Sequence, residues 1–102
     1  MFLARVIGNV VSTKKDDAMQ GRKLLLLRPQ LVDDTSQLRP TANTVVAVDS
    51  LGAGVGEMVI YCQGSSARQA AGMLSVPVDA VVTGIVDSVD VEKRAVYPSG
   101  KN

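Results

Sequence analysis

The chain has 102 residues, which is enough for one domain with a single core. Hydrophobic residues make up 46% of it but aromatic residues only 3%, so the core must be built from aliphatic side chains. A valine-rich composition of this kind favours strands. The net charge of +1 argues against the strong positive field of a nucleic-acid groove, and it leaves little electrostatic repulsion between copies.

The single cysteine, Cys62, excludes a disulfide within the chain. It ends the apolar run that starts at Met58, which favours a buried thiol in a reducing cytosol over a reactive one. No run reaches the ~20 apolar residues of a membrane helix. Arg5 lies inside the first apolar stretch rather than before it, which argues against a signal peptide. We therefore expect a cytoplasmic protein.

Two strands are expected in the first third of the chain. Phe2 to Thr13 is apolar and valine-rich, and Gly8 in its interior indicates a bulge or bend. Leu24 to Leu27 is a continuous apolar run, which predicts a short strand that is buried on both faces and ended by Pro29.

The polar composition from Val32 to Asn43 predicts a surface loop. Three further strands are expected, at Thr44 to Asp49, Met58 to Gln63 and Ala80 to Val91. Ser66 followed by Gln69 matches a helix capping box, so one short helix is expected before Gly72. Five short strands and one helix predict an all-β fold, a small antiparallel barrel that forms a single domain over residues 1–102.

The residue inventory argues against an enzyme. The chain has no histidine, which removes the commonest general base and the commonest zinc ligand. Ser65 and Ser66 have no visible activating base and are more typical of a turn and a helix cap. The carboxylates are scattered, and paired ones at strand ends are more often solvated than catalytic. We predict no catalytic residue, no metal and no cofactor.

A glycine-rich stretch, Gly52 to Glu57, separates the third and fourth expected strands. Its G-x-G-x-G spacing is followed by a strand rather than a helix, so it offers no helix N-terminus to receive a phosphate. Glycines in regular structure cost about 0.5–1 kcal/mol each, so three close together need a reason. A tight turn is one explanation, and close packing against another subunit's backbone is the other.

Several separate blocks resemble one known family, the bacterial microcompartment vertex proteins of the EutN/CcmL type. Three of them are Val45 to Glu57, Gly64 to Arg68, and Gly84 to Asp87. The opening Leu3 to Thr13 and the block Gly21 to Leu26 are also similar. Order, spacing and total length all agree, so the resemblance covers nearly the whole chain.

The resemblance implies a five-stranded OB-like β-barrel and a structural role. It implies a homopentamer, a head-to-tail ring that caps the vertices of a polyhedral microcompartment and closes a shell made by hexameric shell proteins. Nucleic acid and membrane are not expected as partners. The residues that the resemblance implies for the subunit interface and vertex motif are Gly52, Ala53, Gly54, Gly56, Glu57, Gly64, Ser65, Ser66, Arg68 and Asp87.

Some assignments remain open at this point. Arg68 can pair with a carboxylate of its own chain or of a neighbour. The tail around Val96 and Tyr97 either adds a strand to an adjacent subunit or is disordered. The alternative function is an OB-fold module that binds single-stranded nucleic acid, which would need aromatic side chains over a basic groove.

Overall fold

The computed structural model describes residues 1–12, 22–64 and 79–98. These residues form an all-β fold, as predicted, and no helix is found among them. The expected helix around Ser66 lies outside the described residues. In chain order the strands are β1 (Phe2–Val10), β2 (Lys23–Val32), β3 (Leu38–Pro40), β4 (Val45–Asp49), β5 (Met58–Gln63), β6 (Ala80–Val86), β7 (Val89–Val91) and β8 (Arg94–Tyr97).

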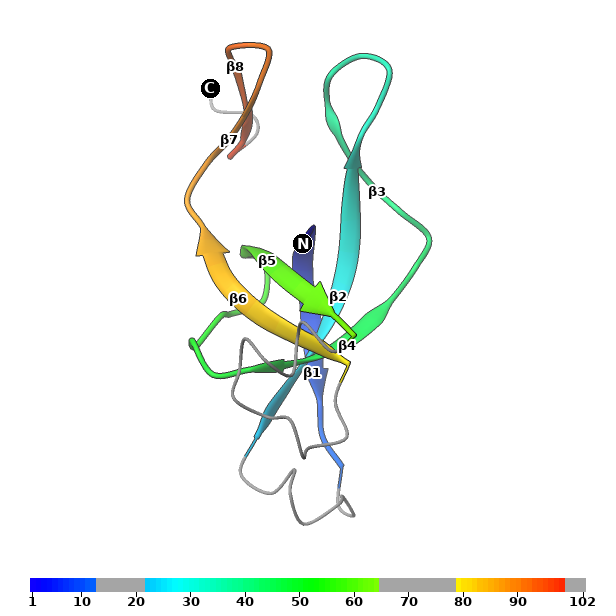
Figure 1. Ribbon diagram of the computed structural model, residues 1–102, viewed down its shortest axis with the longest axis vertical. Helices are drawn as coiled ribbons and strands as arrows, with labels where there is room; N and C mark the ends of the chain where they lie inside the picture. The colour runs from blue at the N-terminus through cyan, green and yellow to red at the C-terminus, as the bar shows by residue number, and fades with distance from the viewer. Residues whose placement is uncertain (13–21, 65–78, 99–102) are drawn as a thin grey trace.

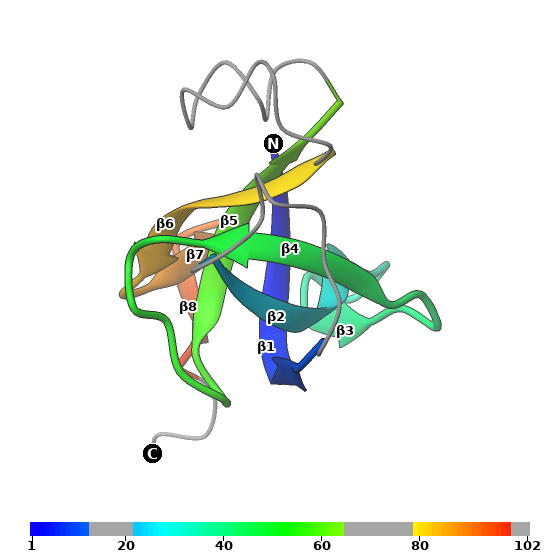
Figure 2. The same ribbon diagram turned by 90° about the horizontal axis from the view of Figure 1, so that it is seen from below.

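Five of the strands close into a ring, which confirms the predicted OB-like barrel (Figures 1 and 2). The order around the ring is β1-β5-β6-β4-β2, and β2 pairs again with β1 to close it. All these pairings are antiparallel except β4 with β6, which is parallel and limited to Val48 and Val81. Closure leaves the barrel without a free sheet edge. The bulge expected at Gly8 is present, because the β1–β2 register shifts between Val6 and Gly8.

The core lies inside this ring and is almost entirely aliphatic. Alternate residues of each strand point inward, since successive side chains of a strand face opposite sides. Leu25 and Leu27 are fully buried, whereas Leu24 and Leu26 are only partly buried on the outer face. The prediction that this run is buried on both faces is therefore wrong, because an antiparallel barrel has one inner and one outer face. The core residues are Ala4, Val6, Leu25, Leu27, Ala47, Ala53, Val59, Tyr61, Ala80 and Val82.

Strand β2 is much longer than predicted. It continues through Pro29 and leaves the barrel, and Val32 to Asn43 is not simply a loop but holds the turn and β3 of a hairpin. Pro29 is tolerated because β2 changes partners there: its pairing with β1 ends at Pro29, and its pairing with β3 begins at Gln30. Proline has no backbone N–H, so it is tolerated at such a point, between two ladders of strand hydrogen bonds.

The last expected strand is also divided. Strand β6 ends at Val86, and the chain turns through Asp87 before β7 and β8 form a second, two-stranded hairpin. The tail therefore forms a strand through β8, which contradicts disorder, one of the two alternatives for this segment. In this chain β8 pairs with β7. Both hairpins project from the same end of the barrel (Figure 1), which gives the molecule extents of 45 × 24 × 23 Å.

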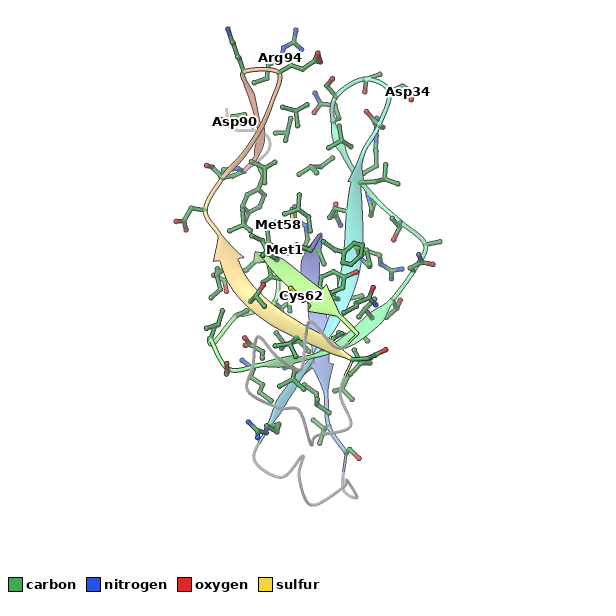
Figure 3. All side chains as sticks on the ribbon, viewed as in Figure 1. Met1, Asp34, Met58, Cys62, Asp90 and Arg94 are labelled. Atoms are coloured by element: carbon green, nitrogen blue, oxygen red, sulfur yellow. The ribbon has the colours of Figure 1, made fainter. Side chains whose placement is uncertain are left out.

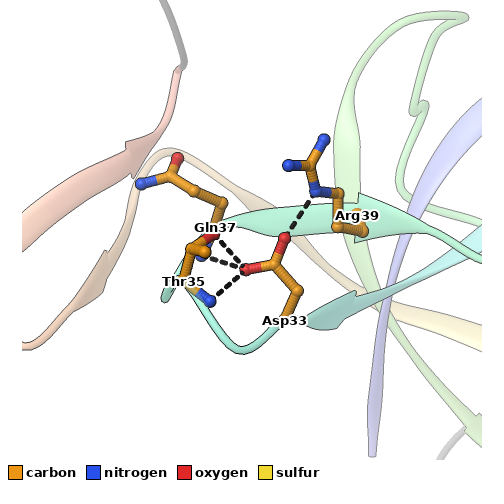
Figure 4. Close-up of polar contacts among 4 residues, drawn as sticks. All are labelled: Asp33, Thr35, Gln37 and Arg39. Carbon is orange, nitrogen blue, oxygen red and sulfur yellow. Dashed lines mark hydrogen bonds and ion pairs between the residues drawn. The ribbon is translucent and has the colours of Figure 1, made fainter.

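Asp33 organises the turn of the β2–β3 hairpin (Figure 4). Its Oδ1 accepts hydrogen bonds from the backbone N–H groups of Thr35 and Gln37, and its Oδ2 accepts one from Arg39 Nε. The Arg39 guanidinium, and after it the Thr35 hydroxyl, hold the pKa of this carboxyl well below its ordinary value of 3.8. The ionised carboxylate thus holds a turn in which Ser36 adopts a positive φ of 59°, a conformation that glycine adopts more readily.

The lowered pKa of Asp33 predicts acid resistance of this turn. A depressed pKa contributes stability that is present above the ordinary value and is lost only as pH falls through the lower, folded-state value. In an NMR titration, the Asp33 carboxyl signal should still report the ionised form at pH 3.8, where an ordinary aspartate is half protonated. Half-protonation of Asp33 at that pH would contradict the arrangement.

A second prediction concerns the turn between β7 and β8. Glu92 and Lys93 both have positive φ, 50° and 68°, as the central residues of a type I′ turn must. Side chains with a Cβ are strained there. Replacing Lys93 by glycine should therefore raise the free energy of unfolding by about 0.5–1 kcal/mol in urea titrations. Lys93→Ala is the control, because it removes the charge but keeps the Cβ, and it should give no gain.

Candidate assembly site

The glycine-rich stretch forms a loop from Ser50 to Glu57 that joins β4 to β5. Asp49, the last residue of β4, is 4% exposed and organises the first half of this loop. Its carboxylate accepts hydrogen bonds from three successive backbone N–H groups, at 2.9, 3.1 and 2.8 Å. The donors are Leu51, Gly52 and Ala53. A charged acceptor that satisfies three backbone donors holds this part of the loop in one conformation.

Glu57 holds the second half. Its Oε1 accepts a hydrogen bond from the Gly54 N–H at 2.6 Å, while its own N–H donates to the Gly54 carbonyl at 3.1 Å. The resulting four-residue turn has Gly56 at its third position with φ of +93°, where a type II turn requires a positive value. Two further backbone hydrogen bonds, of 2.8 and 2.9 Å, join Gly56 and Glu57 to Val6 of β1.

Three of the glycines adopt backbone conformations that other residues rarely adopt. Gly52 and Gly56 have φ of +86° and +93°, and Gly64 has +71°. A Cβ added at any of these three positions would meet nothing within 4 Å. The tight-turn explanation therefore accounts for Gly52 and Gly56 within the chain. The other explanation, close approach of a second subunit, remains a prediction.

The loop combines an anchored base with an apolar outer surface. Ala53 is fully buried in the barrel core, and its carbonyl accepts a hydrogen bond from Lys23 Nζ at 3.0 Å. Leu51 and Val55, in contrast, are 49% and 63% exposed. A rigid loop that presents two aliphatic side chains to solvent is suited to packing against another molecule, since little conformational entropy is lost on binding.

The other predicted site residues fall at two ends of the β5–β6 pair. Val86 pairs with Met58, so Asp87 and Glu57, which flank this pair, lie at the same end of the two strands. Gly64 lies at the opposite end, where its N–H donates to the Asp79 carbonyl at 2.7 Å. Ser65, Ser66 and Arg68 lie outside the described residues, so the partner of Arg68 stays a prediction.

Arg5 and Tyr97 also belong to the site, although neither was predicted from the sequence. Arg5 Nη1 donates to the Gly56 carbonyl at 2.8 Å, and its guanidinium carbon lies 5.4 Å from the centroid of the Tyr97 ring. The Tyr97 hydroxyl accepts a hydrogen bond from the Met58 N–H at 3.3 Å. The alternation of the first strand could have marked Arg5 as an outward-facing cation. Nothing in the sequence connects Tyr97 to β5.

Sites of other kinds are not evident in the part of the chain that the structure describes. No group of three His, Cys, Asp or Glu side chains there is arranged to hold a metal ion. Cys62 is half-buried rather than buried, and its Sγ lies 4.0 Å from Thr83 Oγ1. No helix among these residues is long and apolar enough to cross a membrane.

The sequence profile described as "Ethanolamine utilisation protein EutN/carboxysome" matches residues 1–87. The chain belongs to the EutN/CcmL family. The carboxysome shell vertex protein CcmL of Gloeobacter violaceus is 48% identical over 97 residues, which are 95% of this chain and 93% of that protein. The microcompartment shell vertex protein PduN of Salmonella typhimurium is 48% identical over 89 residues, 87% of this chain and 98% of that protein.

Solved structures of EutN/CcmL proteins have the same fold. The structure of Gloeobacter violaceus CcmL matches with a TM-score of 0.81 at 47% identity and covers 95% of this chain and 96% of that one. GrpN, a pentameric microcompartment shell protein from Rhodospirillum rubrum, matches with a TM-score of 0.75 at 44% identity and covers 89% of this chain and 99% of that one. The chain is thus a structural shell vertex protein of this family and not an enzyme.

The role of Asp49 in this EutN/CcmL protein can be tested by substitution. Asp49→Ala removes the acceptor of three backbone N–H groups and should lower the free energy of unfolding by about 2–3 kcal/mol. Asp49→Asn keeps one carbonyl acceptor and should lose less. Urea unfolding of both variants measures the difference. A loss below about 0.5 kcal/mol for Asp49→Ala would show that the loop does not depend on this carboxylate.

Proposed function

We propose that this chain assembles into a homopentamer that occupies the vertices of a polyhedral bacterial microcompartment shell. The observation that carries the proposal is the similarity, over nearly the whole chain, to proteins described as shell vertex proteins, one of them as pentameric. Residues 1–102 act as one vertex domain. Hexameric shell proteins are the proposed partners, because hexagons alone tile a plane and fivefold units introduce the curvature that closes it.

The form of the subunit supports a ring. A cyclic assembly needs two different patches on each subunit, which meet head to tail around the axis. The chain offers distinct surfaces of this kind: the anchored loop with exposed Leu51 and Val55, and the two hairpins that project from the barrel. We propose the loop from Gly52 to Glu57, together with Asp87, as part of the contact surface. Gly64, Ser65, Ser66 and Arg68 belong to the same proposed motif.

Binding of single-stranded nucleic acid, the alternative function, is disfavoured by the aromatic residues. Such sites stack bases on exposed aromatic rings. Tyr61 is 2% exposed, and the ring of Phe2 lies against it with the centroids 5.3 Å apart. The Tyr97 ring lies beside the Arg5 guanidinium. These three are the chain's only aromatic residues, and because Tyr61 is buried, only Phe2, which is 49% exposed, and the partly exposed Tyr97 could stack on a base.

Native mass spectrometry of the purified protein tests the proposed assembly. We expect a dominant species with the mass of five chains, together with monomer at high dilution. A protein that stays monomeric at high concentration, or that forms a ring of another number, would contradict the proposal.

The vertex role needs a second experiment. Co-expression with the hexameric shell proteins of the same microcompartment should give closed particles that exclude a large fluorescent dextran. Omission of this chain should leave particles that admit it. Equal exclusion with and without the chain would contradict the vertex role even if the pentamer forms.

A further inference from the structure

A groove of about 400 Å³ separates the two projecting hairpins. Its floor is the outer face of β1 and β2, which carries Arg5 and Arg28. Gln30 and Gln37 add two carboxamide groups to the lining. Leu38 of the β2–β3 hairpin and Val96 of the β7–β8 hairpin supply aliphatic walls. Figure 3 shows the side chains of the two hairpins facing each other across this space.

The groove holds positive charge that the chain itself does not neutralise. Arg5 and Arg28 are direct partners in the β1–β2 register, and like charges in such a position repel each other. No aspartate or glutamate lines the groove, and neither arginine forms an ion pair with a described residue. Each guanidinium donates to a backbone carbonyl, of Gly56 at 2.8 Å and of Asn43 at 3.1 Å. A guanidinium has five N–H donors, so most remain available to a carboxylate.

The opposite charge lies on the other face of the β7–β8 hairpin. Val96 is 5% exposed and lines the groove, so the preceding residue, Ala95, faces away from it. Ala95 pairs with Asp90, which is exposed and shares its face. Figure 3 labels Asp90 on the side of the hairpin away from β2–β3. Asp87, in the turn before β7, is also exposed, and neither aspartate forms an ion pair among the described residues.

The groove on one side of this hairpin is thus cationic, whereas the other face carries Asp90, with Asp87 in the turn before β7. We infer that the groove of one subunit receives the acidic face of the neighbouring copy's β7–β8 hairpin, with Arg5 and Arg28 opposite Asp90 and Asp87. This inference rests on the proposed ring and names its contact. It satisfies the head-to-tail requirement, because the two surfaces differ and belong to the same chain.

The projection of the two hairpins from the barrel supports the same occupant. A two-stranded hairpin that stands alone in water is barely stable, and both hairpins project beyond the barrel. The Ser36 hydroxyl links the two tips by a hydrogen bond of 2.7 Å to the Glu92 carboxylate. A second copy whose acidic face enters the groove would contact the bases of both hairpins and pair the two arginines at once.

Charge reversal at Arg28 tests the contact. Arg28→Glu places a carboxylate opposite Asp90 of the neighbouring copy. Because like charges then repel each other across the contact, we expect the dissociation constant of the ring to rise by about tenfold or more. The matched control is Lys93→Glu, which makes the same change of charge at the hairpin tip outside the groove, and should leave the ring intact. Native mass spectrometry across a dilution series measures both, and circular dichroism confirms that each variant is folded.

A second substitution makes the test specific. Adding Asp90→Arg to Arg28→Glu restores opposite charges across the contact and should bring the dissociation constant back to within about threefold of the wild-type value. Adding Asp34→Arg instead restores the net charge at a site outside the groove and should not rescue. The inference would be overturned if Arg28→Glu left the dissociation constant of the ring unchanged. It would also be overturned if the Arg28→Glu variant were a folded monomer and adding Asp90→Arg did not restore the ring. A wild-type monomer would instead refute the proposed ring itself.

Discussion

The fold depends on the double pairing of β1, which bonds to β2 along one edge and to β5 along the other. This strand turns an open sheet into a closed ring, and closure gives every barrel strand one inner and one outer face. Small aliphatic side chains fill most of this narrow interior, and Tyr61 is the one aromatic residue among the core residues. The same strand also anchors the glycine loop, through the two backbone hydrogen bonds at Val6.

Closure also determines what lies outside the barrel. Once the ring is complete, the far part of β2 and the segment after β6 have no barrel partner, so each forms its own hairpin. Tyr97 ties the second hairpin to the barrel through the Met58 N–H. Arg5 lies between this tyrosine and the glycine loop, so the hairpin base and the loop form one connected surface. The features that we assign to assembly are thus consequences of a single closure.

The sequence predicts the barrel better than it predicts the parts around it. Alternation and valine content identify β1, β4 and β5, because these strands lie wholly within the ring. The predicted strand end at Pro29 is wrong, because proline is tolerated where the strand changes partners. The prediction of one continuous last strand is also wrong, because a turn at Asp87 divides it. The Glu92–Lys93 turn was not predicted either, because it contains neither glycine nor asparagine.

The candidate site, too, could be predicted from the sequence only in part. The glycine pattern indicates a turn, and the positive φ values of Gly52 and Gly56 explain it. The carboxylate of Asp49 was not predictable as the organiser, because its three hydrogen bonds depend on a loop path that no local pattern specifies. The Arg5–Arg28 pairing was equally hidden, since it requires the register of two strands that are separated in sequence.

A cryo-electron microscopy reconstruction of the purified assembly, at a resolution that places strands, would show directly how neighbouring subunits meet. We expect a fivefold ring in which each β7–β8 hairpin presents Asp90 to the groove that carries Arg28 in the next subunit. A ring in which that groove faces solvent, or a particle without fivefold symmetry, would contradict this arrangement.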